Sequence, residues 1–159
     1  MKKTTLLALP LALAMMSATA WADSLVRVTL IDKTGAADGG NLRLGMGMNA
    51  DMSKAKMAVN ANPNHVKRGA VRFDVTNLAS AIVHEVIVAQ ITSEDQMLPY
   101  DESRAKVDAE QLFTLGSVNE IAPNKSVSLT LNLNPGKYLL YCNIAGHYMA
   151  GMWTVVDVQ

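Results

Sequence analysis

Short stretches in which apolar and polar residues alternate recur along the chain and predict β-strands with one buried and one solvated face. Alternation is found at residues 25–31, where β-branched side chains are frequent, and at 70–77, and it is strict at 127–133. Apolar runs at residues 82–91, 137–141 and 153–158, and a shorter one at 57–61, also predict strands. Since turn-forming residues separate these runs, about seven or eight short strands are expected, and the predicted fold class is all-β, a β-sandwich.

One internal stretch departs from this pattern. The β-type alternation breaks over residues 93–115, and good helix formers are concentrated at residues 103–112. We therefore expect a short helix there, inside an insertion that precedes the C-terminal strands. The chain shows no internal repeat and no linker composition, so a single domain is expected.

The N-terminus has the composition of a secretory signal peptide. Lys2 and Lys3 precede an apolar run over residues 6–16, and the pattern Ala20-x-Ala22 follows. A charged start, a short apolar centre and small residues at the end predict cleavage after Ala22. The apolar run is too short to favour the alternative, a membrane anchor. We expect residues 1–22 to be removed and residues 23–159 to form one periplasmic domain without a membrane span.

Charge and cysteine content narrow the function further. The sequence has 14 basic and 14 acidic residues, and removal of Lys2 and Lys3 would leave a net charge near −2. General nucleic-acid binding requires a basic surface, so it is not expected. Cys142 is the only cysteine and cannot form an internal disulfide. In an oxidising compartment it is either an inert buried residue or a protected metal ligand.

The surroundings of Cys142 favour the metal. Four residues separate Cys142 from His147, and four more separate His147 from Met152, so that three donor side chains occupy one loop between two predicted strands. A thiolate and a thioether are soft ligands that suit Cu(I), and imidazole suits both oxidation states of copper. A blue-copper site contains two histidines, one cysteine and a weak axial methionine. The pattern therefore requires a second histidine upstream, on another strand.

These motifs resemble the cupredoxins, the blue copper proteins, over nearly the whole predicted mature chain. The shared features are the Tyr-x-x-Tyr-Cys run, the Cys-x4-His-x4-Met loop and the paired strands. The likeness is to small periplasmic proteins of the plastocyanin, azurin, rusticyanin and sulfocyanin kinds. It implies a Greek-key β-sandwich that holds one type 1 copper, cycling between Cu(II) and Cu(I).

The resemblance also implies which residue completes the ligand set. The first histidine ligand of a cupredoxin opens the strand after an Asn-containing turn, and His84 occupies that position after Asn77. His65 lies in a polar turn and is expected to be solvated. The expected metal ligands are therefore His84, Cys142, His147 and Met152.

Many cupredoxins have an asparagine directly after the first histidine, where it holds the residue that follows the cysteine; this chain has Glu85. Either Glu85 accepts a hydrogen bond from Asn143 and its charge lowers the reduction potential, or it points into solvent.

Two further groups of residues each allow two interpretations. Four methionines, Met46, Met48, Met52 and Met57, lie close together in the sequence and either bind a second Cu(I) or fill the core. Apolar residues around His147, namely Ile144, Ala145, Met149 and Ala150, either form a docking patch for partners or pack within their own loop.

The expected function is that of a periplasmic one-electron carrier, and its expected partners are redox proteins that dock near His147. The alternative is a copper chaperone or storage protein that uses the same site and the methionine-rich segment at residues 46–57, with copper-trafficking proteins as partners. Enzymatic activity is not expected, because a methionine-capped site offers no evident open position. A monomer is expected.

Overall fold

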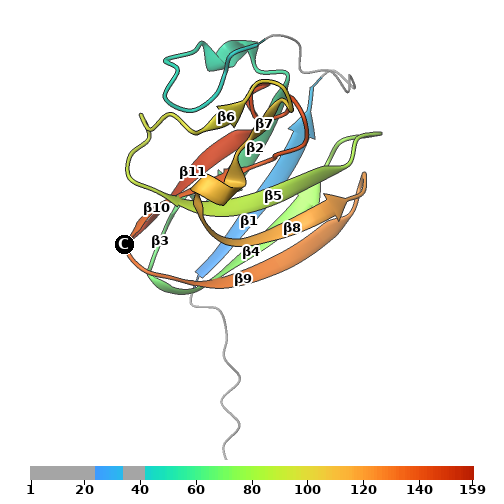
Figure 1. The fold of residues 1–159 in the computed structure, drawn as a ribbon. Helices are drawn as coiled ribbons and strands as arrows, with labels where there is room; N and C mark the ends of the chain where they lie inside the picture. Colours follow the sequence, from blue (N-terminus) through green and yellow to red (C-terminus); the bar gives the residue numbers. More distant parts are fainter. Residues whose placement is uncertain (1–23, 34–41) are drawn as a thin grey trace, which may run out of the picture.

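The computed structural model describes residues 24–33 and 42–159, and these form a sandwich of two β-sheets (Figure 1). The expected all-β sandwich is confirmed. The predicted signal peptide and its cleavage point lie outside the described residues and remain a prediction. Nowhere in the described part of the chain is there a helix with the length and apolar character that a bilayer crossing requires.

The first sheet has four strands in the order β2-β1-β4-β9. They are β1 (Ser24–Asp32), β2 (Met57–Asn62), β4 (Gly69–Asn77) and β9 (Ser126–Leu133). β1 runs parallel to β4, whereas its pairing with β2 and that of β4 with β9 are antiparallel. Inward-facing residues alternate along β1 and β4, as the sequence pattern predicts.

The second sheet has five strands in the order β3-β11-β10-β5-β8. They are β3 (His65–Val66), β5 (His84–Ile91), β8 (Phe113–Ile121), β10 (Gly136–Tyr141) and β11 (Trp153–Val158). β10 lies at the centre of this sheet and pairs antiparallel with both β5 and β11. The described part of the chain thus contains eight strands of six or more residues, in agreement with the expected number, together with three strands of two residues each.

The main core fills the space between the sheets. Val28 and Phe73 from the first sheet meet Val88, Leu140 and other buried residues of the second, and these four named side chains are fully buried. Each aliphatic or aromatic side chain of this kind stabilises the fold by roughly 1.5–3 kcal/mol.

A second cluster covers the outer face of the second sheet. Leu139 and Tyr141 of β10 pack there with Met46, Ala89 and Tyr148, while their neighbours Tyr138 and Leu140 face the main core. Because both faces of β10 are covered, its last four residues are all buried. This explains why residues 137–141 form a continuous apolar run rather than an alternating one.

The helix expected at residues 103–112 does not form. β6 (Tyr100–Asp101) and β7 (Lys106–Val107) make a short hairpin there, followed by a single 3₁₀ turn, η2 (Ala109–Gln111). A similar turn, η1 (Met52–Lys54), precedes β2. The helix formers are overruled because Asp101 accepts hydrogen bonds from the backbone N–H groups of Ser103 and Arg104, which favours a tight turn over a helix.

The break in β pattern expected over residues 93–115 also ends earlier than predicted, because β8 already begins at Phe113. β8 is an edge strand with mostly exposed or half-buried residues, and Phe113 itself is exposed. An edge strand with so little burial carries only a weak alternation of apolar and polar residues, so the sequence pattern there was not informative.

Candidate metal centre

Strand topology brings together two of the expected ligands that are far apart in the sequence. β5 and β10 run antiparallel, with Tyr141 opposite Ile87, so the end of β10 lies beside the start of β5. His84 is the first residue of β5, and Cys142 directly follows β10. His84 shares the inward-facing parity of Val86, and Cys142 shares that of Leu140, because side chains two residues apart point to the same face of a strand. Both side chains therefore point into the same end of the sandwich.

The loop between β10 and β11 carries the other two expected ligands, His147 and Met152. Its ends are joined by a hydrogen bond from the N–H of Cys142 to the carbonyl of Met152, and the N–H of Met152 donates to the carbonyl of His147, each over 3.1 Å. Gly151 has a φ of 96°, and a Cβ there would lie 2.7 Å from the Cβ of Ala55. Only glycine fits this closely packed turn, which places Met152 back at the main core.

Three donor atoms converge at this end. The Sγ of Cys142 lies 3.4 Å from the Nδ1 of His147 and 4.0 Å from the Nδ1 of His84, and the two ring nitrogens are 3.3 Å apart. The rings meet edge to face, with an interplanar angle of 65°. Among the described residues these three form the one group of histidine, cysteine and acidic side chains that could together hold a metal ion.

The donor triangle has the right size for one ion. A triangle with sides of 3.3, 3.4 and 4.0 Å has a circumscribed radius of about 2.1 Å, and the bonds that a divalent ion such as zinc makes to nitrogen and sulfur are about 2.0–2.3 Å long. One thiolate and two imidazoles are also the equatorial donors of a copper site. In size and in chemistry, the residues present fit a copper ion.

All four expected ligands are shielded from solvent. The exposed fraction is 0% for His84, Cys142 and Met152 and 2% for His147. Met152 packs in the main core next to Cys142, its hydrogen-bonded neighbour, which places it beside the donor triangle.

Burial sets the protonation of the donors in the metal-free protein. It lowers the pKa of His84 to about 4, helped by the neighbouring His147, and it also lowers the pKa of His147, while the charge of Asp32 opposes both shifts. Both imidazoles are therefore neutral at pH 7 and able to bind a metal.

Burial raises the pKa of the Cys142 thiol to about 12, although backbone N–H groups of Glu85 and Ile144 donate hydrogen bonds to its sulfur. The thiol is thus protonated without metal, and a bound cation is needed to hold it as thiolate.

Of the two arrangements expected for Glu85, the structure shows the hydrogen bond with Asn143. The carboxylate of Glu85 accepts a hydrogen bond from the backbone N–H of Asn143 over 3.1 Å, in a partly buried position. Glu85 thus makes two contacts around Cys142: its backbone N–H donates to the sulfur, and its carboxylate binds the backbone of the next residue, Asn143.

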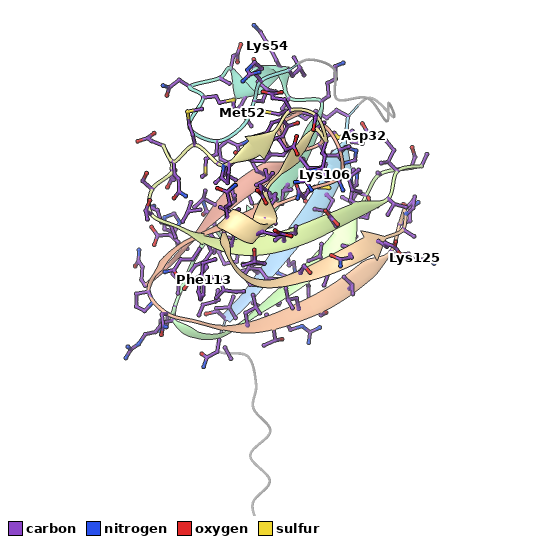
Figure 2. All side chains as sticks on the ribbon, in the orientation of Figure 1. Asp32, Met52, Lys54, Lys106, Phe113 and Lys125 are labelled. Atoms are coloured by element: carbon purple, nitrogen blue, oxygen red, sulfur yellow. The ribbon has the colours of Figure 1, made fainter. Side chains whose placement is uncertain are left out.

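Other expectations at this site are modified. His65 is exposed, as predicted, although it lies in β3 rather than in a turn and contacts the side chain of Asn64. The four methionines of residues 46–57 do not form one group: Met46 and Met57 are fully buried in different core clusters, and Met52, labelled in the upper part of Figure 2, is 38% exposed. For Met46 and Met57, the interpretation as core residues is correct.

The apolar residues around His147 are divided between core and surface. Met149 and Ala150 are buried, so they pack within the protein and cannot form a docking patch. Ala145 is exposed and Ile144 is half-buried. Two apolar residues of the 78–83 loop, Leu78 and Val83, are 54% and 40% exposed and belong to the segment that leads directly into His84.

Asn77 supports the site in a way that sequence reasoning did not assign. Its fully buried side chain donates to the carbonyls of Ile82 and Ile121, each over 2.8 Å, and accepts from the N–H of Ala79. Since Ile121 pairs with His84 across β5 and β8, Asn77 fixes the loop that positions this histidine. The only signal in the sequence is an asparagine at the end of an alternating strand, which is typical of many turns.

Comparison with known proteins supports copper binding. The family model described as copper binding proteins, plastocyanin/azurin family, matches residues 46–159, which include all four expected ligands. No curated protein matches the chain.

Solved structures with a similar fold include two kinds of protein. Auracyanin B is 20% identical, with a TM-score of 0.52 over 87% of this chain and 91% of that chain. Reduced auracyanin from the photosynthetic bacterium Roseiflexus castenholzii is 13% identical, with a TM-score of 0.50 over 87% and 98%. Rusticyanin from Thiobacillus ferrooxidans is 15% identical, with a TM-score of 0.51 over 87% and 79%. At such identities the likeness concerns the fold alone.

Proposed function

The chain belongs to the plastocyanin/azurin family of copper-binding proteins, and on that premise we propose that it is a periplasmic type 1 copper protein that carries single electrons between redox partners. Copper would be held by the Nδ1 atoms of His84 and His147, by the Sγ of Cys142 and, more weakly, by the thioether of Met152.

The observation that carries this proposal is the closed triangle of two imidazole nitrogens and one thiol sulfur inside the sandwich. These donors suit both oxidation states of copper, since imidazole serves either one and the sulfur donors favour Cu(I). Two of them are attached to the paired strands β5 and β10, which restrict their movement. A site whose ligands change position little between oxidation states is suited to rapid electron transfer.

The residues of the chain contribute to this function in three ways. His84 and His147 remain neutral at pH 7, so both rings are available as ligands. Cys142 would hold the cation as a thiolate, having lost its thiol proton, and the backbone N–H groups at its sulfur would stabilise that negative charge. Burial of all four side chains shields the site from bulk water. When bound, copper supplies the one-electron redox change.

We further propose that redox partners dock at the end of the sandwich near His147. Support comes from exposed apolar residues on two loops beside the ligands, with Leu78 and Val83 before His84 and Ala145 beside His147. Exposed apolar groups of this kind often mark interaction sites. The proposed location, the periplasm, depends on the N-terminal pattern of residues 1–22.

The alternative role as copper chaperone or store has weaker support. Its additional argument was the methionine-rich segment, yet Met46 and Met57 are fully buried in separate clusters and cannot present sulfur to an incoming ion without local unfolding. Burial of the four proposed ligands likewise favours a resident metal over one that is handed on.

Addition of Cu(II) to the purified, copper-free protein tests the proposal. We expect an intense blue or green absorption from thiolate-to-copper charge transfer, with one copper bound per chain. C142S should abolish this band, whereas H65A, a change at an exposed histidine outside the triangle, should leave it unchanged. Copper binding without the band would refute a type 1 site, and bleaching by H65A would refute the ligand assignment.

A further inference from the structure

The β6–β7 hairpin contacts the metal-binding loop through a set of hydrogen bonds that no ligand role explains. The side chain of Asn143 accepts from the N–H of Val107 over 2.7 Å and donates to the carbonyl of Val107 over 2.9 Å. Three residues further along, the N–H of Gly146 donates to the carbonyl of Ala105 over 2.8 Å. The segment of residues 105–107, called the strap below, thus bonds both ends of the 143–146 segment that joins Cys142 to His147.

We propose that the strap holds the Cys142–His147 segment in its ligand-binding conformation before copper arrives, and that Asn143 is the positioning residue through which it does so. This inference rests on the proposed copper site. Asn143 is 9% exposed and Val107 is 2% exposed, so water does not compete effectively for the bonds between them. Without the strap, the buried amide of Asn143 would lose two partners, which disfavours any arrangement in which the loop moves away.

The hairpin is itself fixed at both ends, as a positioning element must be. At its tip the carboxylate of Asp101 accepts from the N–H and hydroxyl of Ser103 and from the main chain and guanidinium of Arg104. These bonds hold the pKa of Asp101 well below its usual range. At its base the N–H of Asp108 donates to the carbonyl of Pro99 over 2.8 Å.

The backbone of the strap is strained at the residue that contacts the loop. Ala105 has a φ of 52°, in the left-handed region that is unfavourable for a residue other than glycine. The carbonyl of this same residue receives the N–H of Gly146. Backbone strain of this kind persists where surrounding contacts over-determine the conformation, and it is concentrated at functional sites.

The first experiment uses the unmodified protein and measures amide hydrogen exchange with and without copper. We expect the amides of Val107 and Gly146 to be protected in the copper-free protein to within about tenfold of the copper-loaded form, since their partners are already in place. Exchange of these two amides at unprotected rates in the copper-free protein would overturn the inference, whatever happens in variants.

The second experiment compares N143A with N60A, which removes an exposed asparagine from β2 in the other sheet. In copper-free N143A, exchange of the Gly146 amide should accelerate by at least about tenfold, the equivalent of one hydrogen bond. In the copper-loaded variant, the charge-transfer band and the reduction potential should both shift. N60A should match the unmodified protein in amide exchange, charge-transfer band and reduction potential. Faster exchange with an unchanged band and potential would reduce Asn143 to a merely structural residue and overturn its positioning role.

The two proposals fail in different ways. The exchange measurements on copper-free protein do not depend on the metal. They therefore show whether the strap holds the loop in place even if no charge-transfer band ever forms. Absence of the band in unmodified protein would instead refute the type 1 site. If N143A does not fold, the comparison of copper-free and copper-loaded unmodified protein still decides the inference.

Discussion

Lowering the pH of the copper-free protein from 7 to 5 should destabilise it, and His84 should account for a measurable share of the loss. Burial lowers the pKa of His84 from 6.5 to about 4 in the folded state. The folded state therefore binds its proton less tightly than the unfolded state does. The stability associated with this difference is present in full above pH 6.5 and is lost as the pH falls toward 4.

The magnitude follows from the two pKa values. With 6.5 for the unfolded and about 4 for the folded state, linkage gives a loss of about 2 kcal/mol at pH 5. Because domains of this size unfold with roughly 5–15 kcal/mol, a loss of this size is readily measured. At pH 5 most carboxylates are still ionised, so they contribute little to the change.

Urea unfolding of the copper-free protein at pH 7 and pH 5 provides the assay, with H84Q as the test variant and H65Q as the matched control. The unmodified protein and H65Q should lose about 2 kcal/mol more between the two pH values than H84Q does. Equal losses in H84Q and the unmodified protein would refute the reasoning, because His84 would then not be buried in its neutral form.

Three other changes test the remaining features of the site. M152L should raise the reduction potential, with copper and colour retained, because the apolar side chain excludes water and disfavours Cu(II). M152Q should lower the potential, and voltammetry measures both changes. Loss of copper from both variants would show that Met152 is needed to retain the metal and would favour the chaperone role. E85Q should raise the potential by removing a negative charge that stabilises Cu(II), and an unchanged potential would mean that solvent screens this carboxylate. N77A should reduce the free energy of unfolding by about 3 kcal/mol, because three buried hydrogen bonds are lost. Urea unfolding measures this change, with N60A as the control. A change no larger than that in N60A would contradict the supporting role of Asn77.

Much of the metal centre could be predicted because its determinants are local. Cys142, His147 and Met152 lie on one loop of the sequence, and the flanking runs show the composition of strands. Donor chemistry then indicates copper without reference to the fold. The alternating strands β1, β4 and β9 were also predictable, because inward-facing residues alternate with more exposed ones in each, although those of β9 are mostly only half-buried.

Contacts between distant segments could not be predicted in the same way. The Sγ of Cys142 and the Nδ1 of His84 come from residues 58 positions apart, and their proximity depends on the pairing of β5 with β10. Resemblance to cupredoxins indicated His84 in advance; the alternation of apolar residues alone does not show which strands become neighbours.

The methionines and the inserted hairpin show the physical reason most clearly. Met46 and Met57 look equivalent in the sequence, yet one packs outside the second sheet and the other between the sheets, because burial depends on which surfaces meet rather than on the residue type. Residues 103–112 have the composition of a helix, but Asp101 and the bonds of Asn143 to Val107 stabilise a hairpin instead. Local composition thus determined the donor set and the strand class, whereas long-range pairing and side-chain hydrogen bonds decided where each donor stands and what holds it there.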